Sequence, residues 1–141
     1  MSKRGRAAVG VLTTFLLLAT VPEVQLRARL LRRSWNARVA VEGPSMEPTV
    51  AAGDWLLVDP DAFVKTRLKA GDLVLAPDPR LPERLLIKRV ERVDPDGWLR
   101  LAGDASDSST DSRTFGALEP GAVAGRPWFR YWPLGRVGLV R

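Results

Sequence analysis

From residue 38 onward the sequence is divided into short extended segments by glycine, proline and aspartate, and this division limits the possible folds most strongly. Five segments have the apolar and β-branched composition of strands: 38–43 (RVAVEG), 54–59 (DWLLVD), 72–76 (DLVLA), 84–93 (RLLIKRVERV) and 97–103 (GWLRLAG). An aromatic extended segment follows at 126–133, and Gly-Asp pairs at 53–54 and 71–72 predict turns that lead into strands. We therefore predict a mainly β, compact, barrel-like domain over residues 39–141.

An uncharged apolar run, AAVGVLTTFLLLATVP, occupies residues 7–22 after a basic tip at 1–6. As a helix it would span about 24 Å, which is short of the roughly 30 Å hydrocarbon core and would require snorkelling or local thinning. A cleaved signal peptide is the alternative. However, cleavage after Ala19 would put Leu17 at −3, where a small residue is required. We therefore predict one uncleaved N-terminal transmembrane helix.

The net charge of +6 is concentrated at the N-terminus, because residues 1–38 contribute +7 and residues 39–141 contribute −1. A basic excess beside an apolar run favours contact with a lipid bilayer over binding of nucleic acid. Residues 23–38 mix arginines with leucines, which predicts a basic amphipathic juxtamembrane helix. A helical extension of the anchor is the alternative. Basic residues on both sides of the run leave its orientation open.

The chain contains neither histidine nor cysteine. This composition excludes Ser-His-Asp and Cys-His catalysis, histidine- or cysteine-ligated zinc, and disulfides. A hydrolase with this sequence would need a carboxylate, a lysine or the N-terminal amine as its base.

Lys88 is the best candidate for such a base among the four lysines. Strand alternation in LLIKRV places it on the same face as Leu86 and Val90. An ammonium group on an apolar face is costly, so the pKa of Lys88 is expected to fall toward neutrality. A solvated lysine on an edge strand is the alternative reading.

Ser45 is the candidate nucleophile, because it lies in the proline-flanked turn EGPSMEPT at 42–49. Such a turn fixes the angle of the hydroxyl group and can direct backbone N–H groups at one point, as an oxyanion hole requires. An ordinary proline-rich turn is the alternative.

Ser45 and Lys88 belong to the first two of three motifs that occur in a fixed order along the chain. GPSMEPT is followed about 40 residues later by IKRV, and then by GDASDSSTDSRTFG at 103–116. Together they resemble the type I signal peptidase family, over about residues 39–133 and the anchor. The resemblance implies a β-rich catalytic core with a Ser-Lys dyad, in which Ser45 is acylated and Lys88 is the general base.

The resemblance also assigns supporting roles. Gly43 and Ser45 would form the oxyanion hole through backbone N–H groups. The remaining assignments are dyad support by Asp104, Ser109, Asp111, Arg89 and Arg113, and a substrate groove lined by Val41, Met46 and Ile87. In the family Ser109 would orient the lysine, and Arg89, Asp111 and Arg113 would form an ion-pair cluster. The substrate would bind as an extended strand, with small residues preferred at −1 and −3.

The third motif departs from the family pattern at three positions, namely Ala105, Ser108 and Thr114. Only residues 90–102 separate it from the lysine motif. The chain is therefore similar in size to the short Gram-positive, mitochondrial inner-membrane and nickel-superoxide-dismutase-maturation branches. We expect no cofactor and no metal, since the loop from Asp104 lacks the glycine and glutamate of a calcium-binding EF-hand.

The sequence thus predicts a single-pass membrane serine endopeptidase that removes signal or leader peptides from preproteins. Its catalytic domain is expected on the extracytoplasmic face, although the charge pattern is ambiguous. Two alternatives stay open: a maturation protease for a single precursor, and a non-catalytic membrane-tethered β module.

Overall fold

The computed structural model describes residues 22–105 and 116–141. The chain divides into two units, residues 1–32 and residues 33–141. The structure contains these elements: α2 (Pro22–Asn36), β1 (Val39–Ala40), β2 (Trp55–Asp59), β3 (Leu73–Asp78), β4 (Leu81–Val93), β5 (Leu99–Ala102), η2 (Pro120–Ala122), β6 (Arg126–Trp132), η3 (Leu134–Arg136) and β7 (Gly138–Leu139). Each predicted extended segment therefore overlaps a strand, although β3 and β4 extend beyond the predicted bounds, and β7 was not predicted.

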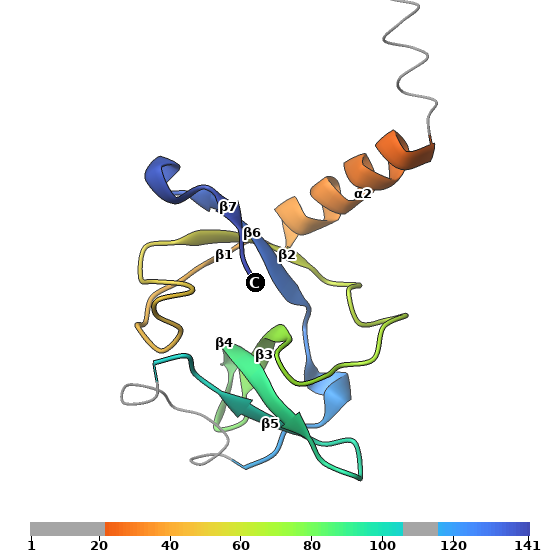
Figure 1. The fold of residues 1–141 in the computed structure, drawn as a ribbon, viewed down its shortest axis with the longest axis vertical. Coiled ribbons are helices and arrows are strands. Elements are labelled where there is room, and N and C mark those ends of the chain that lie inside the picture. The colour runs from red at the N-terminus through yellow and green to blue at the C-terminus, as the bar shows by residue number, and fades with distance from the viewer. Residues whose placement is uncertain (1–21, 106–115) are drawn as a thin grey trace, which may run out of the picture. The chain divides into compact units, whose positions relative to one another are not determined.

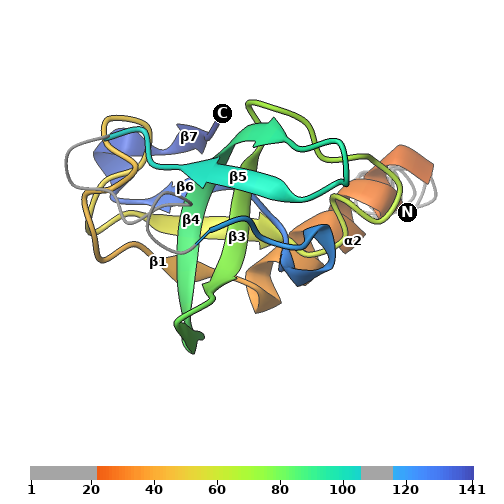
Figure 2. The same cartoon turned by 90° about the horizontal axis from the view of Figure 1, so that it is seen from below.

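Two antiparallel sheets make up the second unit, with strand orders β1-β2-β6-β7 and β3-β4-β5. Figure 1 shows one sheet above the other, and in Figure 2 the long strands β3 and β4 cross β2 and β6. The sheets meet at one bridge, where the Leu75 N–H donates to the Gly125 carbonyl at 2.9 Å and the Ala124 N–H donates to the Leu75 carbonyl at 2.7 Å.

The mainly β prediction is confirmed, but in the described residues the two sheets do not close into a barrel. Among the described residues, one bridge joins β3 to the segment before β6, and another, Leu99–Leu118, joins β5 to the segment before η2. One residue pair at each junction is too little to form a continuous ladder, so the sheets remain separate.

Strand β3 is buried on both faces, which explains why its sequence is continuously apolar rather than alternating. Val74 and Ala76 belong to a core cluster with Val90 of β4 and with β5. Leu73 faces the opposite way, into a second cluster with Met46. The two clusters thus share one sheet, and successive residues of β3 and β4 point into different cores.

Helix α2 carries Glu23 in its first turn and Arg33 in its last turn, which suits the helix dipole. Its final turn belongs to the second unit, where Arg33 pairs with Asp61 and the Trp128 indole N–H donates to Ser34 Oγ at 3.0 Å. Within residues 22–105 and 116–141, no helix has the length and apolar character needed to cross a bilayer. The predicted anchor at 7–22 lies outside the described residues except for Pro22.

Gly125 should be intolerant of a side chain, because a Cβ there would lie 2.6 Å from the Asp59 carbonyl oxygen and 2.9 Å from Val58 Cγ1. We expect Gly125→Ala to lower the free energy of unfolding by about 1–3 kcal/mol through overpacking and strain. Thermal unfolding in detergent would measure the change. Gly135→Ala is the matched control, since nothing lies within 4 Å of its Cβ position. Equal melting temperatures for the two variants would contradict the close contact.

Candidate active site

Ser45 lies in the turn that follows β1. The Glu47 N–H donates to the Pro44 carbonyl at 3.0 Å, which closes a turn around Ser45, and the Val50 N–H donates to the Met46 carbonyl at 2.9 Å, which closes the next turn. Met46 and Val50 are buried in the second core cluster, while Ser45, directly before Met46, stays half-buried. The apolar anchors therefore fix the turn and leave the serine at the surface of a groove.

Lys88 is only 1% exposed and is among the largest fully buried side chains of the described residues. It lies in β4 between Leu86 and Val90 and opposite Val74 of β3. The alternation predicted for this strand is thus present, with residues 86, 88 and 90 buried and 87 and 89 partly exposed. The Lys88 side chain is therefore enclosed within the sheet and kept away from bulk solvent.

The carboxylate of Asp104 connects the Ser45 turn to the Lys88 strand. Arg89 binds it through two hydrogen bonds, Nε to Oδ1 at 2.8 Å and Nη2 to Oδ2 at 2.7 Å. The Thr49 hydroxyl donates to Oδ2 at 2.6 Å. Next to Asp104, the Ala105 N–H donates to the Ser45 carbonyl at 3.1 Å. The start of the third motif therefore holds residues 45 and 49 against the neighbour of Lys88.

The electrostatics of this contact keep Asp104 ionised. Its pKa is lowered, chiefly by the hydrogen bonds from Arg89 and also by the Thr49 hydroxyl, against an opposing effect of burial. Hydrogen bonding to Asp104 raises the pKa of Arg89 in turn. A bidentate arginine–carboxylate pair has a fixed geometry, which suits it to position two chain segments.

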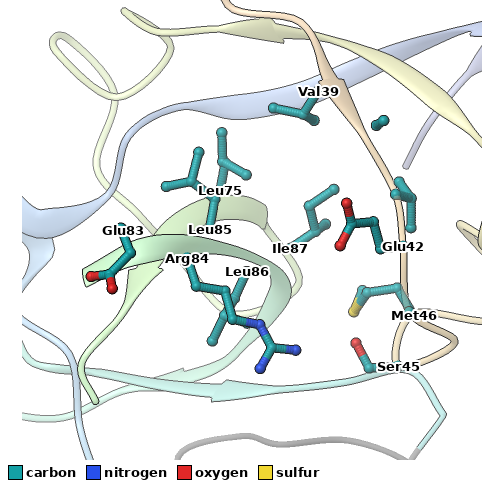
Figure 3. A pocket seen from close by; sticks show the side chains of 13 residues that line it. Val39, Glu42, Ser45, Met46, Leu75, Glu83, Arg84, Leu85, Leu86 and Ile87 are labelled. Atoms are coloured by element: carbon teal, nitrogen blue, oxygen red, sulfur yellow. The ribbon is translucent and has the colours of Figure 1, made fainter. Parts of the chain in front are cut away.

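A groove with a volume of about 460 Å³ begins at Ser45. Its lining residues are Val39, Ala40, Val41, Glu42, Gly43, Ser45, Met46, Leu75, Glu83, Arg84, Leu85, Leu86 and Ile87. Figure 3 shows the segment from Val39 to Glu42 along one side and the β4 residues 83–87 along the other. We call these two sides the β1 wall and the β4 wall.

Both walls present a strand edge that no described strand covers. Strand β4 pairs with β3 from Leu81 to Arg89, but its other edge pairs with β5 only from Arg89 onward. Strand β1 pairs with β2 on one side only. The backbone groups on the open edges of residues 83–87 and 39–40 are therefore positioned to hydrogen-bond an extended chain laid between them.

The structure brings most of the predicted site residues together. Gly43, Ser45 and the three predicted groove residues, Val41, Met46 and Ile87, all line the groove. Asp104 and Arg89 do not line it, but they form an ion pair that joins the Ser45 turn to the Lys88 strand. Ser109, Asp111 and Arg113 lie outside the described residues, so the predicted cluster of Arg89 with Asp111 and Arg113 stays a prediction.

Sequence reasoning missed the role of Thr49 and the charged groove residues Glu42, Glu83 and Arg84. Nothing local in the sequence pairs Thr49 with a carboxylate 55 residues away. Arg84, by contrast, could have been found, because strand alternation places it on the Lys88 face of β4. Within the described parts of the chain, no group of three or more carboxylates is arranged to hold a metal ion.

The chain is similar in sequence to several known peptidases. The family model described as "Signal peptidase, peptidase S26" matches residues 11–97. Mitochondrial inner membrane protease subunit 1 of Homo sapiens is 31% identical over 122 residues, covering 73% of this chain and 74% of that protein. Mitochondrial ATP-independent inner membrane protease subunit 1a of Arabidopsis thaliana is 30% identical over 123 residues, covering 72% and 73%. A probable thylakoidal processing peptidase 2 of the same plant is 34% identical over 89 residues, covering 62% of this chain and 22% of that protein.

The Asp104 pair should make stability depend on pH. Because the pKa of Asp104 is lower in the folded chain than in the unfolded one, its carboxylate stabilises the fold above about pH 4, the unfolded value. That contribution is lost as the pH falls through the folded-state pKa. We expect wild type to exceed Asp104→Asn in melting temperature near pH 7 and to lose this advantage in more acidic buffer.

The control for removing one carboxylate is Glu91→Gln, because Glu91 is an exposed residue of β4, the strand that contains Arg89. An Asp104→Asn deficit that stays constant from pH 7 down to about pH 3 would contradict the ionised pair.

Proposed function

Because this chain belongs to the signal peptidase, peptidase S26, family, we propose that it is a membrane-anchored serine endopeptidase that removes leader peptides from preproteins. The observation that carries the proposal is the groove between two open strand edges, with Ser45 at one end. A preprotein segment would lie in it as an added strand, hydrogen-bonded to residues 39–40 on one wall and 83–87 on the other.

In this proposal Ser45 is the nucleophile and Lys88 is the general base, and the burial of Lys88 supports its role. The neutral amine of Lys88 takes the proton from Ser45 Oγ as that oxygen attacks the carbonyl carbon of the substrate. The N–H of Ser45 and the backbone at Gly43 stabilise the oxyanion that forms. Cleavage of the C–N bond releases an amine that receives the proton from Lys88, and an acyl ester remains on Ser45.

Deacylation repeats the proton transfers with water. Lys88 removes a proton from water as the water oxygen attacks the ester carbonyl, and it returns that proton to Ser45 Oγ as the leader peptide departs. Asp104 keeps the turn and the strand in register through Thr49 and Arg89. Ser109 would orient the amine, as the resemblance implies. Displacing a catalytic group by about 1 Å would lower the rate strongly, so the rigid contacts of Asp104 with Thr49 and Arg89 favour catalysis.

Membrane attachment is the second part of the proposal. The relatives are named as proteases of the mitochondrial inner membrane, and residues 7–22 have the composition of a single-pass anchor. Residues 23–38, which contain most of α2, would lie along the headgroups as a basic amphipathic segment. Within residues 33–141, Trp35 and Trp55 are exposed, and their ring centroids lie 5.3 and 6.3 Å from that of Tyr131. Tryptophan and tyrosine favour the membrane interface.

The catalytic domain would then lie on the extracytoplasmic face, where preproteins emerge. A dedicated protease for one precursor would use the same dyad and groove, so it differs from this proposal only in the range of substrates.

The dyad predicts which variants lose cleavage. We expect wild type to cut a secretory preprotein in detergent micelles after a small residue, and Ser45→Ala and Lys88→Met to lower kcat by at least about 10³-fold. Methionine nearly matches the unbranched shape of lysine, so Lys88→Met should keep the buried packing and the melting temperature. Gel assay of product and thermal unfolding would be measured on the same samples.

Lys65→Ala is the control, because Lys65 is an exposed lysine outside the groove. Cleavage that survives in Ser45→Ala would refute the mechanism. Activity of wild type on one precursor but not on general preproteins would select the dedicated maturation protease.

The anchor predicts resistance to alkaline extraction. We expect the full chain to stay in the membrane pellet at high pH. Leu17→Arg should increase the soluble fraction, because an arginine near the centre of a spanning helix costs about 2.5–3.5 kcal/mol. Immunoblots of pellet and supernatant would quantify the change. Equal extraction of wild type and Leu17→Arg would count against residues 7–22 as a spanning segment.

A further inference from the structure

Eight of the thirteen residues that line the groove are apolar, and three are charged: Glu42, Glu83 and Arg84. Among the described residues, none of the three forms an ion pair or a side-chain hydrogen bond, although the positive charge of Arg84 helps to lower the pKa of Asp78. Arginines elsewhere in the same sheet are paired, as Arg80 is with Asp78 and Arg89 with Asp104. The charges in the groove are therefore left for whatever enters it.

Of the three charged side chains, that of Arg84 points most clearly toward Ser45 (Figure 3). Figure 3 shows its guanidinium reaching from the β4 wall toward Ser45, whereas the Glu83 side chain points to the far end of the groove. The Glu42 carboxylate lies on the opposite wall, beside Ile87. The groove thus presents a positive group on one wall and a negative group on the other.

Strand geometry relates Arg84 to the catalytic position. Side chains of a strand alternate between faces, so residues 84, 86 and 88 share one face of β4. Arg84 therefore lies on the same face as the proposed base Lys88, with Leu86 between them. A substrate strand laid along this edge also alternates, and only its side chains on that face come near the guanidinium.

We infer that Arg84 is a specificity-determining residue that selects an acidic side chain in the leader peptide, a few residues before the cleaved bond. This inference rests on the proposed function, since it assumes that a leader peptide fills the groove. The fork of guanidinium donors suits a carboxylate better than a neutral amide of the same shape. Glu42 on the opposite wall makes the preference depend on position, because a carboxylate facing that wall is repelled.

The test compares leader peptides that differ only in having a carboxylate or a neutral amide at one position. Asp and Asn are placed in turn at positions −2, −3, −4 and −5, and the ratio of kcat/KM for the Asp and Asn peptides is measured at each. For wild type we expect a ratio of roughly three to ten at one position, or at two positions of the same parity, as for one partly exposed ion pair. Added salt should lower that ratio.

Variants separate Arg84 from the general charge of the protein. Arg84→Gln should bring the Asp/Asn ratio to about one, and Arg84→Glu should bring it below one. Arg67→Gln, the loss of an exposed arginine outside the groove, should keep the wild-type ratio. Each ratio is taken within one variant, so a change in overall rate does not affect it.

The outcomes also separate this inference from the proposed function. If wild type cleaves the peptides with a ratio near one at every position, or if the preference survives in Arg84→Gln, the role of Arg84 is refuted while the protease remains. If wild type cleaves none of the peptides and no preprotein, the proposed function is refuted, and the specificity falls with it.

Discussion

The site is held together by one carboxylate. Asp104 accepts hydrogen bonds from Arg89, which neighbours Lys88, and from Thr49, which belongs to the turn of Ser45. The two candidate catalytic residues come from different chain segments and lie beside different core clusters, so no local structure fixes them relative to each other. The charge-assisted hydrogen bonds of Asp104 fix their relative position, because such bonds depend on direction, whereas apolar packing does not. Arg130 reinforces it by donating to both the Thr49 carbonyl at 3.2 Å and the buried Asp54 at 2.9 Å.

The burial of Lys88 is unfavourable for stability, and the apolar packing of the neighbouring strand compensates for it. Lys88 is buried between Leu86 and Val90, and removing its amine from water has a desolvation cost. The neighbouring strand β3 offsets this by burying both of its faces. The most apolar strand of this sheet, β3, therefore lies directly beside the titratable side chain of Lys88. Such a local conflict between sequence and environment is typical of functional sites.

Local pattern in the sequence was enough to predict the strands and the face of Lys88. Alternation places residues 86, 88 and 90 together whatever the tertiary fold, and the Gly-Asp turns at 53–54 and 71–72 fall where Gly53 and Gly71 adopt positive φ. The family resemblance added the groove residues Val41, Met46 and Ile87.

What the sequence could not predict depends on contacts between distant segments. The Thr49–Asp104 hydrogen bond spans 55 residues. Strand β7 is two residues long and too short for alternation to be visible. The barrel prediction was only partly correct, because closure depends on how many residues pair at the sheet junctions, and strand composition does not encode that number.

The open edges of β1 and β4 have a thermodynamic consequence. They belong to different sheets, which in the described residues are otherwise joined by the Leu75–Gly125 bridge. A peptide strand inserted between them would complete both hydrogen-bond ladders at once and act as a temporary eighth strand that links the sheets. Occupancy and folding are then coupled equilibria, so the protein is most resistant to unfolding while it holds a substrate and loosens when the products leave.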